Sequence, residues 1–131
     1  MTNAEKVKEF MEAFGQEVKE SPELVDHKTA MLRLKLILEE YDELDAANAD
    51  RDLVAVADAL SDILYVVYGA AHAYGIPIDK CFDEVHNSNM SKLGKDGKPI
   101  YREDGKILKG PYFYEPDLKG IMYDWFFKEY N

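Results

Sequence analysis

Cysteine and positive charge are scarce in this sequence, and each scarcity narrows the possible classes of protein. A single cysteine, Cys81, among 131 residues leaves no partner for an internal disulfide. Basic side chains number 16 against 26 acidic ones, and the net charge of −10 disfavours a nucleic-acid polymer or an anionic membrane as partner. Residues 1–20 are charged throughout, unlike a secretory signal. We therefore expect a cytoplasmic protein.

Strand-like alternation of apolar and polar residues is absent before residue 98, so the first two-thirds of the chain is predicted to be all-α. Asp50 and Asp79 are suitable N-caps, and Gly75 followed by Pro77 is typical of a helix end. The spacing of apolar residues predicts four helices, over residues 3–18, from 26 or 28 to 47, 51–74 and 79–93. We expect the last three to form an antiparallel bundle, with the first alongside.

The length of the chain and its 47% hydrophobic content predict one domain over residues 1–131, with its core at 26–93. Residues 94–116 are rich in glycine and lysine, and the turn dipeptides Asp96-Gly97 and Asp104-Gly105 predict a small hairpin across 99–108. An amphipathic pattern that includes Trp125 and Phe126 predicts a short C-terminal helix over 117–130.

Acidic residues fall on helix faces that should be apolar. In the helix ending at 47, Glu40 and Glu43 lie within the apolar arc and Glu39 lies at its edge. The helix over 51–74 is apolar nearly all round, yet it carries Asp58 and Asp62 one turn apart, where like charges repel. Buried carboxylates without partners cost several kcal/mol, so this arrangement requires a compensating cation.

A divalent metal is the simplest compensating cation. Oxygen ligands without a nearby thiolate or imidazole select hard ions, which favours Mg²⁺, with Mn²⁺ as the alternative. The candidate ligands are the five acids just described: Glu39, Glu40, Glu43, Asp58 and Asp62. A second interpretation stays open, in which the acids form a solvated face and the aspartates pair with lysines.

The pattern Glu39-Glu40-x-x-Glu43, followed by Asp62 on the next helix, resembles the paired acidic motifs of the all-α nucleoside triphosphate pyrophosphohydrolases. That superfamily includes MazG, phosphoribosyl-ATP pyrophosphohydrolase and the dimeric dUTPases. The first motif, Glu-Glu-x-x-Glu, is matched in full. The second, Glu-x-x-Asp, is matched only at Asp62, because Ala59 stands where the family has glutamate and the nearest acid is Asp58.

The resemblance implies a MazG-like helical bundle that hydrolyses a nucleoside triphosphate, or a nucleotide like phosphoribosyl-ATP, between the α and β phosphates. The products are a monophosphate and pyrophosphate. It implies Mg²⁺ bound by the acids of the two motifs, with Asp58 as a further ligand. A glutamate of the first motif, Glu39 or Glu40, acts as the base for the attacking water.

Four further residues are candidates for substrate binding. Asn89 is placed on the apolar face of the helix over 79–93, Lys92 lies on its flank, and the segment 86–92 is similar to a phosphate-side segment of the family. Lys109 closes a segment from 92 to 109 with six basic and three acidic side chains. Tyr65 lies one turn after Asp62 and can stack on a base. The alternatives are an amide bonded to backbone, surface lysines on a solvated hairpin, and simple packing of the tyrosine.

A function of a different class stays open, because Ala59 is also compatible with a degenerate relative that serves as a non-catalytic helical interaction protein. In either case the helix over 51–74 is too apolar for a small bundle to cover. We therefore expect a homodimer or homotetramer, in which helices of a second subunit complete the cover.

Overall fold

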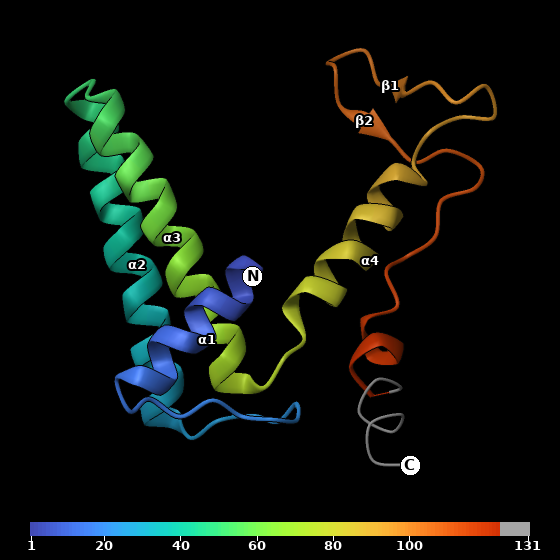
Figure 1. Cartoon of the computed structure of the whole chain (residues 1–131). Helices are drawn as coiled ribbons and strands as arrows, with labels where there is room; N and C mark the ends of the chain where they lie inside the picture. Colours follow the sequence, from blue (N-terminus) through green and yellow to red (C-terminus); the bar gives the residue numbers. More distant parts are fainter. Residues whose placement is uncertain (124–131) are drawn as a thin grey trace. The chain divides into compact units, whose positions relative to one another are not determined.

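The computed structural model describes residues 1–123, which fall into two compact units, Met1–Ile78 and a second unit that begins at Asp79 (Figure 1). Most of the chain is helical, as predicted, and the remainder includes one small hairpin. The prediction that residues 1–131 act as a single domain stays a prediction.

The first unit contains three helices: α1 (Asn3–Ala13), α2 (His27–Ala49) and α3 (Leu53–Tyr74). The two long helices, α2 and α3, lie side by side and run antiparallel, and α1 packs against α3 (Figure 1). A ring nitrogen of His72 on α3 lies 2.7 Å from the carbonyl oxygen of Ala4, which fixes α1 to the end of α3. The antiparallel arrangement is confirmed for these helices.

The junction between α2 and α3 corrects one predicted cap. Asp50 ends α2 as its C-cap, Arg51 takes a positive φ of 56°, and Asp52 is the N-cap of α3. The reason is geometric: Asp52 has an extended backbone, and its carboxylate accepts a hydrogen bond from the backbone N–H of Ala55 at 3.1 Å. The tight turn therefore lies two residues later in the chain than the sequence predicts.

The end of α1 is also earlier than predicted, at Ala13 instead of residue 18. Gly15 adopts a φ of 74°, a left-handed conformation that glycine takes without strain, and Gln16 donates a backbone hydrogen bond to Met11. Residues 14–26 then form a loop along the end of α3, where Lys19 and Glu23 donate backbone hydrogen bonds to His72 and Tyr74. This loop bounds a pocket described below.

Gly75 ends α3 as predicted, with a φ of 69°. A Cβ atom at this position would lie 2.1 Å from the carbonyl oxygen of Ser21, so only glycine allows the loop to approach. The loop therefore packs closely against the C-terminus of α3, where its backbone also donates hydrogen bonds to the helix.

Small residues fill the interior of the first unit. Met11 and Ala59 are buried, with Ala47, Ala71 and Ala73, whereas many large apolar side chains of α2 and α3 face outward. Leu34 and Leu38 on α2 are 59% and 57% exposed, and Leu53 on α3 is 81% exposed. Buried alanines thus let α2 and α3 pack closely, and many leucine side chains of the two helices remain exposed to solvent.

The second unit carries α4 (Ile78–Met90) and a hairpin of β1 (Ile100–Tyr101) and β2 (Ile107–Leu108). The hairpin pairs antiparallel, with Ile100 opposite Leu108, and confirms the prediction for residues 99–108. Asp79 is not the N-cap of α4, because the helix begins one residue earlier and places Asp79 in its first turn. Residues 118–123 are helical, and the rest of the predicted C-terminal helix, with Trp125 and Phe126, lies outside the described residues.

Length and composition alone would let α3 cross a membrane, since an 18-residue window of it has a mean hydropathy of 1.6. The core helix of a soluble protein meets the same criterion, and Asp58 and Asp62 within α3 are costly in lipid. The predicted cytoplasmic location stays a prediction.

Candidate metal and catalytic site

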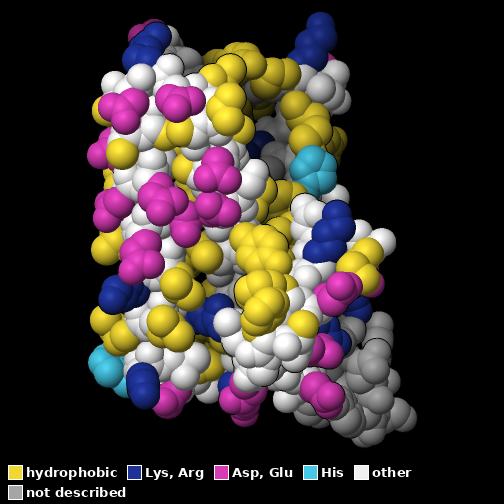
Figure 2. All heavy atoms as spheres, turned by 60° about the vertical axis from the view of Figure 1, so that its left-hand side comes forward, with side chains coloured by type: hydrophobic (Ala, Val, Ile, Leu, Met, Phe, Trp, Pro, Cys, Tyr) yellow, Lys and Arg dark blue, Asp and Glu magenta, His cyan; other side chains and the backbone are white. Residues whose placement is uncertain are grey.

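Three carboxylates meet between the two long helices. Glu40 and Glu43 lie one turn apart on the face of α2 that is turned toward α3, and Asp62 faces them from α3. One carboxylate oxygen from each residue lies within 4.8 Å of those of the other two. Figure 2 shows acidic side chains gathered over this helix pair. The predicted convergence of acids from consecutive helices is therefore present for these three residues.

The environment of the cluster disfavours negative charge. Glu40 is half-buried, and its Oε2 has no hydrogen-bond partner among residues 1–123. Burial, a hydrogen bond with Glu43 and the charges of neighbouring acids raise the pKa of Glu40 to about 7. Burial and the charges of Asp58 and Glu43 also raise the pKa of Asp62. The cluster therefore carries repulsion that a bound cation would relieve.

The donor set of Glu40, Glu43 and Asp62 fits a hard divalent cation. All three donors are carboxylate oxygens, and they are close enough to converge on one ion. Mg²⁺ usually takes few protein carboxylates and keeps several waters, which leaves positions for phosphate oxygens. Glu40 also supports a bound cation, because its buried Oε2 has no hydrogen-bond partner in the described part of the chain.

The other two predicted metal ligands, Glu39 and Asp58, lie outside this cluster. Glu39 is exposed, with its carboxylate 4.0 Å from Nζ of Lys35 one turn earlier. Asp58 is exposed as well and acts on Asp62 through its charge. Each lies one turn from a member of the cluster on its own helix, Glu39 from Glu43 and Asp58 from Asp62, and their predicted role as ligands stays a prediction. Ala59, which occupies the family's glutamate position, is buried.

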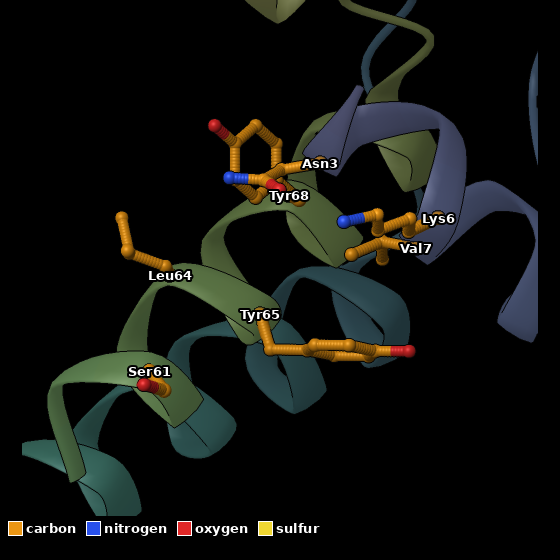
Figure 3. A pocket seen from close by; sticks show the side chains of 7 residues that line it. All are labelled: Asn3, Lys6, Val7, Ser61, Leu64, Tyr65 and Tyr68. Atoms are coloured by element: carbon orange, nitrogen blue, oxygen red, sulfur yellow. The ribbon is translucent and has the colours of Figure 1, made fainter. Parts of the chain in front are cut away.

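Tyr65 extends from α3 toward α1 and is 41% exposed. Its ring lies edge-on to that of Phe10 on α1, with 5.6 Å between the centroids. The same side chain lines a small pocket of about 240 Å³ together with Lys6 and Tyr68 (Figure 3). The packing role is therefore observed and the substrate role stays a prediction. Phe10 was not predictable as a neighbour of Tyr65, because residues 3–13 carry no motif of the site.

The remaining predicted substrate residues belong to the second unit. Asn89 is exposed, so its predicted place on a core face is wrong: the buried face of α4 carries Cys81 and Ser88 instead. The Ser88 hydroxyl is satisfied there by donating a hydrogen bond to the carbonyl oxygen of Tyr114 at 2.8 Å. Lys92 is half-buried, and Nζ of Lys109 lies 3.5 Å from the carboxylate of Glu115. Their substrate roles stay predictions.

Arg33 is a residue that the sequence analysis missed. It lies on α2 seven residues before Glu40, which is two turns along the same face of the helix. That spacing was the available signal, since a basic residue on a face turned toward an apolar helix is as unusual as an acidic one. The pocket beside Arg33 is described further below.

Residues 7–89 of this chain are similar to a known protein family. A model of the phosphoribosyl-ATP pyrophosphohydrolase family matches residues 7–89, which include all three clustered acids but neither Lys92 nor Lys109. An uncharacterised protein of Acanthamoeba polyphaga mimivirus is 33% identical over 118 residues, and the match covers 85% of this chain. The chain spans 43% of the length of that viral relative.

A solved structure supports the fold. The crystal structure of a candidate NTP pyrophosphohydrolase from Exiguobacterium sp. 255-15 aligns with a TM-score of 0.54 and 23% sequence identity. The alignment covers 100% of this chain and 99% of that chain. The mainly helical fold is therefore shared with that structure.

Proposed function

Because this chain belongs to the phosphoribosyl-ATP pyrophosphohydrolase family, we propose that it hydrolyses a nucleotide between its α and β phosphates, releasing a monophosphate and pyrophosphate. The proposed substrate is a nucleoside triphosphate or a nucleotide like phosphoribosyl-ATP. The observation that carries the proposal is the meeting of Glu40, Glu43 and Asp62 within 4.8 Å, inside the region that matches the family.

Glu40, Glu43 and Asp62 are the proposed ligands of Mg²⁺ or Mn²⁺, and the adjacent Glu39 and Asp58 add negative charge around them. The metal supplies neutralisation of phosphate charge and acidification of bound water. A glutamate of the first motif takes the proton of the attacking water. Glu40 and Glu39 are the two candidates: Glu40 belongs to the carboxylate cluster, and Glu39 lies exposed beside it.

We further propose that Tyr65, Asn89, Lys92 and Lys109 bind the substrate. Tyr65 offers an aromatic surface for a base, and the two lysines and the amide offer hydrogen-bond donors for phosphate oxygens. The support for Lys92 and Lys109 is the basic character of the segment between them, within a chain of net charge −10.

The competing function is a non-catalytic interaction protein, and Ala59 is the observation that favours it. The alanine is only 2% exposed, so the position that carries glutamate in the family is closed to solvent here. A site reduced to three acids is compatible with loss of catalysis.

The experiment that separates the two functions is a pyrophosphate-release screen across nucleoside triphosphates and phosphoribosyl-ATP, with Mg²⁺, with Mn²⁺ and with EDTA. Metal-dependent release that is lost in Glu40→Gln and kept in Asp45→Asn supports the enzyme. Asp45 is the matched control because it is an exposed acid of the same helix outside the cluster. No release from any substrate, or release that survives EDTA, would contradict the proposed metal-dependent activity.

We also propose that the protein is a homodimer or homotetramer. The support is the outward apolar surface of α2 and α3, to which Leu34, Leu53 and Val54 contribute. Exposed apolar surface of this extent is typical of an interface. Size-exclusion chromatography with light scattering tests the proposal, and a monomer at micromolar concentration would contradict it.

A further inference from the structure

Arg33 is a half-buried charged side chain without a partner in the described part of the chain. It projects from α2 across α3 at Gly69, where an added Cβ would lie 2.8 Å from Nη1 of the guanidinium. Its Nε is buried and has no hydrogen-bond partner among residues 1–123, and burial lowers the pKa of its guanidinium. No acidic side chain in the described part of the chain forms an ion pair with it. Such a cation is costly unless an anion compensates it.

Arg33 lines a pocket in the first unit, between the loop 14–26, the start of α2 and the end of α3. The pocket has a volume of about 510 Å³, which lies within the range of small-molecule sites. Its walls combine polar and charged side chains with aliphatic ones, and the aliphatic ones include Leu24, Val25, Leu32 and Leu36. Backbone hydrogen bonds from Lys19 and Glu23 to α3 hold the loop that forms one wall. The pocket therefore offers aliphatic surface beside the guanidinium of Arg33.

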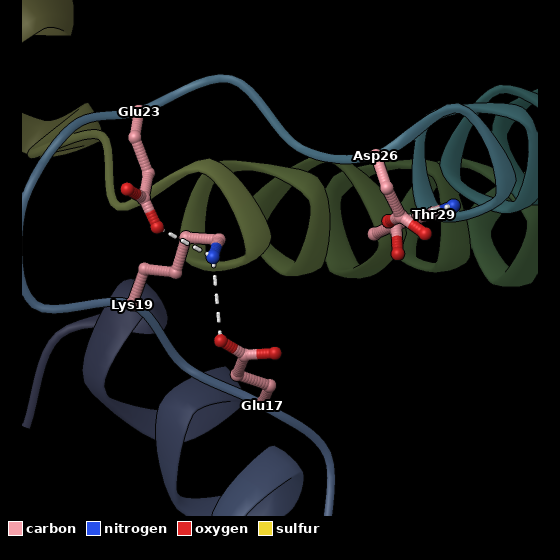
Figure 4. Close-up of polar contacts among 5 residues, drawn as sticks. All are labelled: Glu17, Lys19, Glu23, Asp26 and Thr29. Atoms are coloured by element: carbon pink, nitrogen blue, oxygen red, sulfur yellow. Dashed lines mark hydrogen bonds and ion pairs between the residues drawn. The ribbon is translucent and has the colours of Figure 1, made fainter.

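The other charges of this pocket are already satisfied. Figure 4 shows that Lys19 donates to the carboxylates of Glu17 and Glu23, at 3.3 and 2.6 Å. Asp26 is the N-cap of α2, and its carboxylate accepts a hydrogen bond from the backbone N–H of Thr29 at 3.3 Å. The formal charges that line the pocket sum to zero. Because the pocket has no net charge, long-range attraction would contribute little to binding. Hydrogen bonds from Arg33 would hold an anionic ligand.

We propose that this pocket binds a small organic anion, a phosphate or carboxylate group carried on an apolar body. The acidic group would accept hydrogen bonds from the Arg33 guanidinium, which suits both kinds of oxyanion. The apolar body would lie against Leu32, Leu36 and Val25.

The proposed site is separate from the carboxylate cluster. Arg33 and Glu40 share one face of α2 but lie two turns apart, about 10.5 Å along the helix axis. None of the three clustered acids lines the pocket. Binding to Arg33 should therefore need no metal, and it can be measured in EDTA whether or not the protein is a pyrophosphohydrolase.

Calorimetry on the full chain in EDTA tests the proposal, with AMP and octanoate as the two probes and inorganic phosphate and chloride as references. Binding of AMP alone identifies a phosphate ligand, and binding of octanoate alone identifies a carboxylate. Arg33→Met should weaken binding at least about tenfold, the factor that corresponds to a lost charge-assisted hydrogen bond. The matched control is Lys35→Met, which removes an exposed cation of the same helix and should bind as the wild type does.

Gly69→Ala is the second variant, because it keeps the charge but forces the guanidinium of Arg33 to move from its place against α3. It should also weaken probe binding while the protein stays folded, and it keeps the test decisive if Arg33→Met fails to fold. The proposal is overturned if neither probe binds the wild type, or if both variants bind as tightly as the wild type. It is also overturned if Arg33→Met dissociates an oligomer, since Arg33 would then pair with a carboxylate of a second copy.

Discussion

Replacing Glu40 by glutamine tests the reasoning about the carboxylate cluster most directly. The substitution removes one negative charge and keeps the size and one oxygen of the side chain. In the metal-free protein it should relieve repulsion from Glu43 and Asp62, whose ligand oxygens lie within 4.8 Å of that of Glu40. The variant should therefore be more stable than the wild type in EDTA, and less responsive to Mg²⁺.

The magnitude follows from the separation of the charges. Two unit charges at 4.8 Å repel by about 1 kcal/mol at the dielectric constant of water, the appropriate value because Glu43 is exposed and its partners are half-exposed. Removing two such pairs gives about 2 kcal/mol at pH 8. A chain of 131 residues has an unfolding entropy of about 0.28 kcal/mol/K. The melting temperature in EDTA should rise by about 7 °C.

The response to Mg²⁺ should change in the opposite direction. Metal at 100 times its Kd stabilises the wild type by about 2.7 kcal/mol, which corresponds to a shift of about 10 °C. If the loss of one of three ligands weakens binding about 100-fold, the shift falls below about 2 °C. Thermal melts in EDTA and in millimolar Mg²⁺ measure both effects, with Asp45→Asn as control. A variant that melts below the wild type in EDTA, or that keeps the full Mg²⁺ shift, would refute the reasoning.

Three further predictions concern the titration of Glu40, the substrate lysines and the oligomer. The folded pKa of Glu40, about 7, lies above its ordinary value of 4.5, so its stabilising contribution is complete below pH 4.5 and is lost as the pH rises through 7. Melts of the metal-free protein should show this loss, and Glu40→Gln should flatten it. Lys92→Ala and Lys109→Ala should each raise KM for a triphosphate; unchanged kinetics in both would remove their role. Leu53→Glu should shift the light-scattering mass of the oligomer toward the monomer, whereas an unchanged mass would exclude this part of α3 from the interface.

Most helices were predictable because their apolar residues recur every three to four positions along long segments. The stop at Gly75 and the hairpin across 99–108 followed from local turn chemistry and are confirmed. The N-cap of α3 was not predictable, because Asp50 and Asp52 are both good capping residues and only the backbone decides between them. Local sequence preferences therefore predict which segments are helices, whereas the residues at which a helix begins and ends depend on the backbone geometry of the folded chain.

The candidate site was predicted in part. Glu40, Glu43 and Asp62 were found from their place on apolar faces, and the structure brings them together. Glu39 was included because it belongs to the first motif, and Asp58 because it is the acid nearest to Ala59. The structure leaves both exposed beside the cluster, and their role as ligands stays a prediction. Arg33 was not predicted because only acidic residues on apolar helix faces were considered as candidates.

The register of α2 against α3 explains these outcomes together. In an antiparallel pair, a step toward the C-terminus of one helix is a step toward the N-terminus of the other. Glu40 meets Asp62, and seven residues away on each helix Arg33 meets Gly69, so both contacts belong to one seam. Ala59 is buried on α3, whereas its exposed neighbour Asp58 is turned about 100° from it. Asp58 lies one turn before Asp62 and acts on it through its charge, and a metal held by Glu40, Glu43 and Asp62 alone would complete its coordination with water or substrate oxygens.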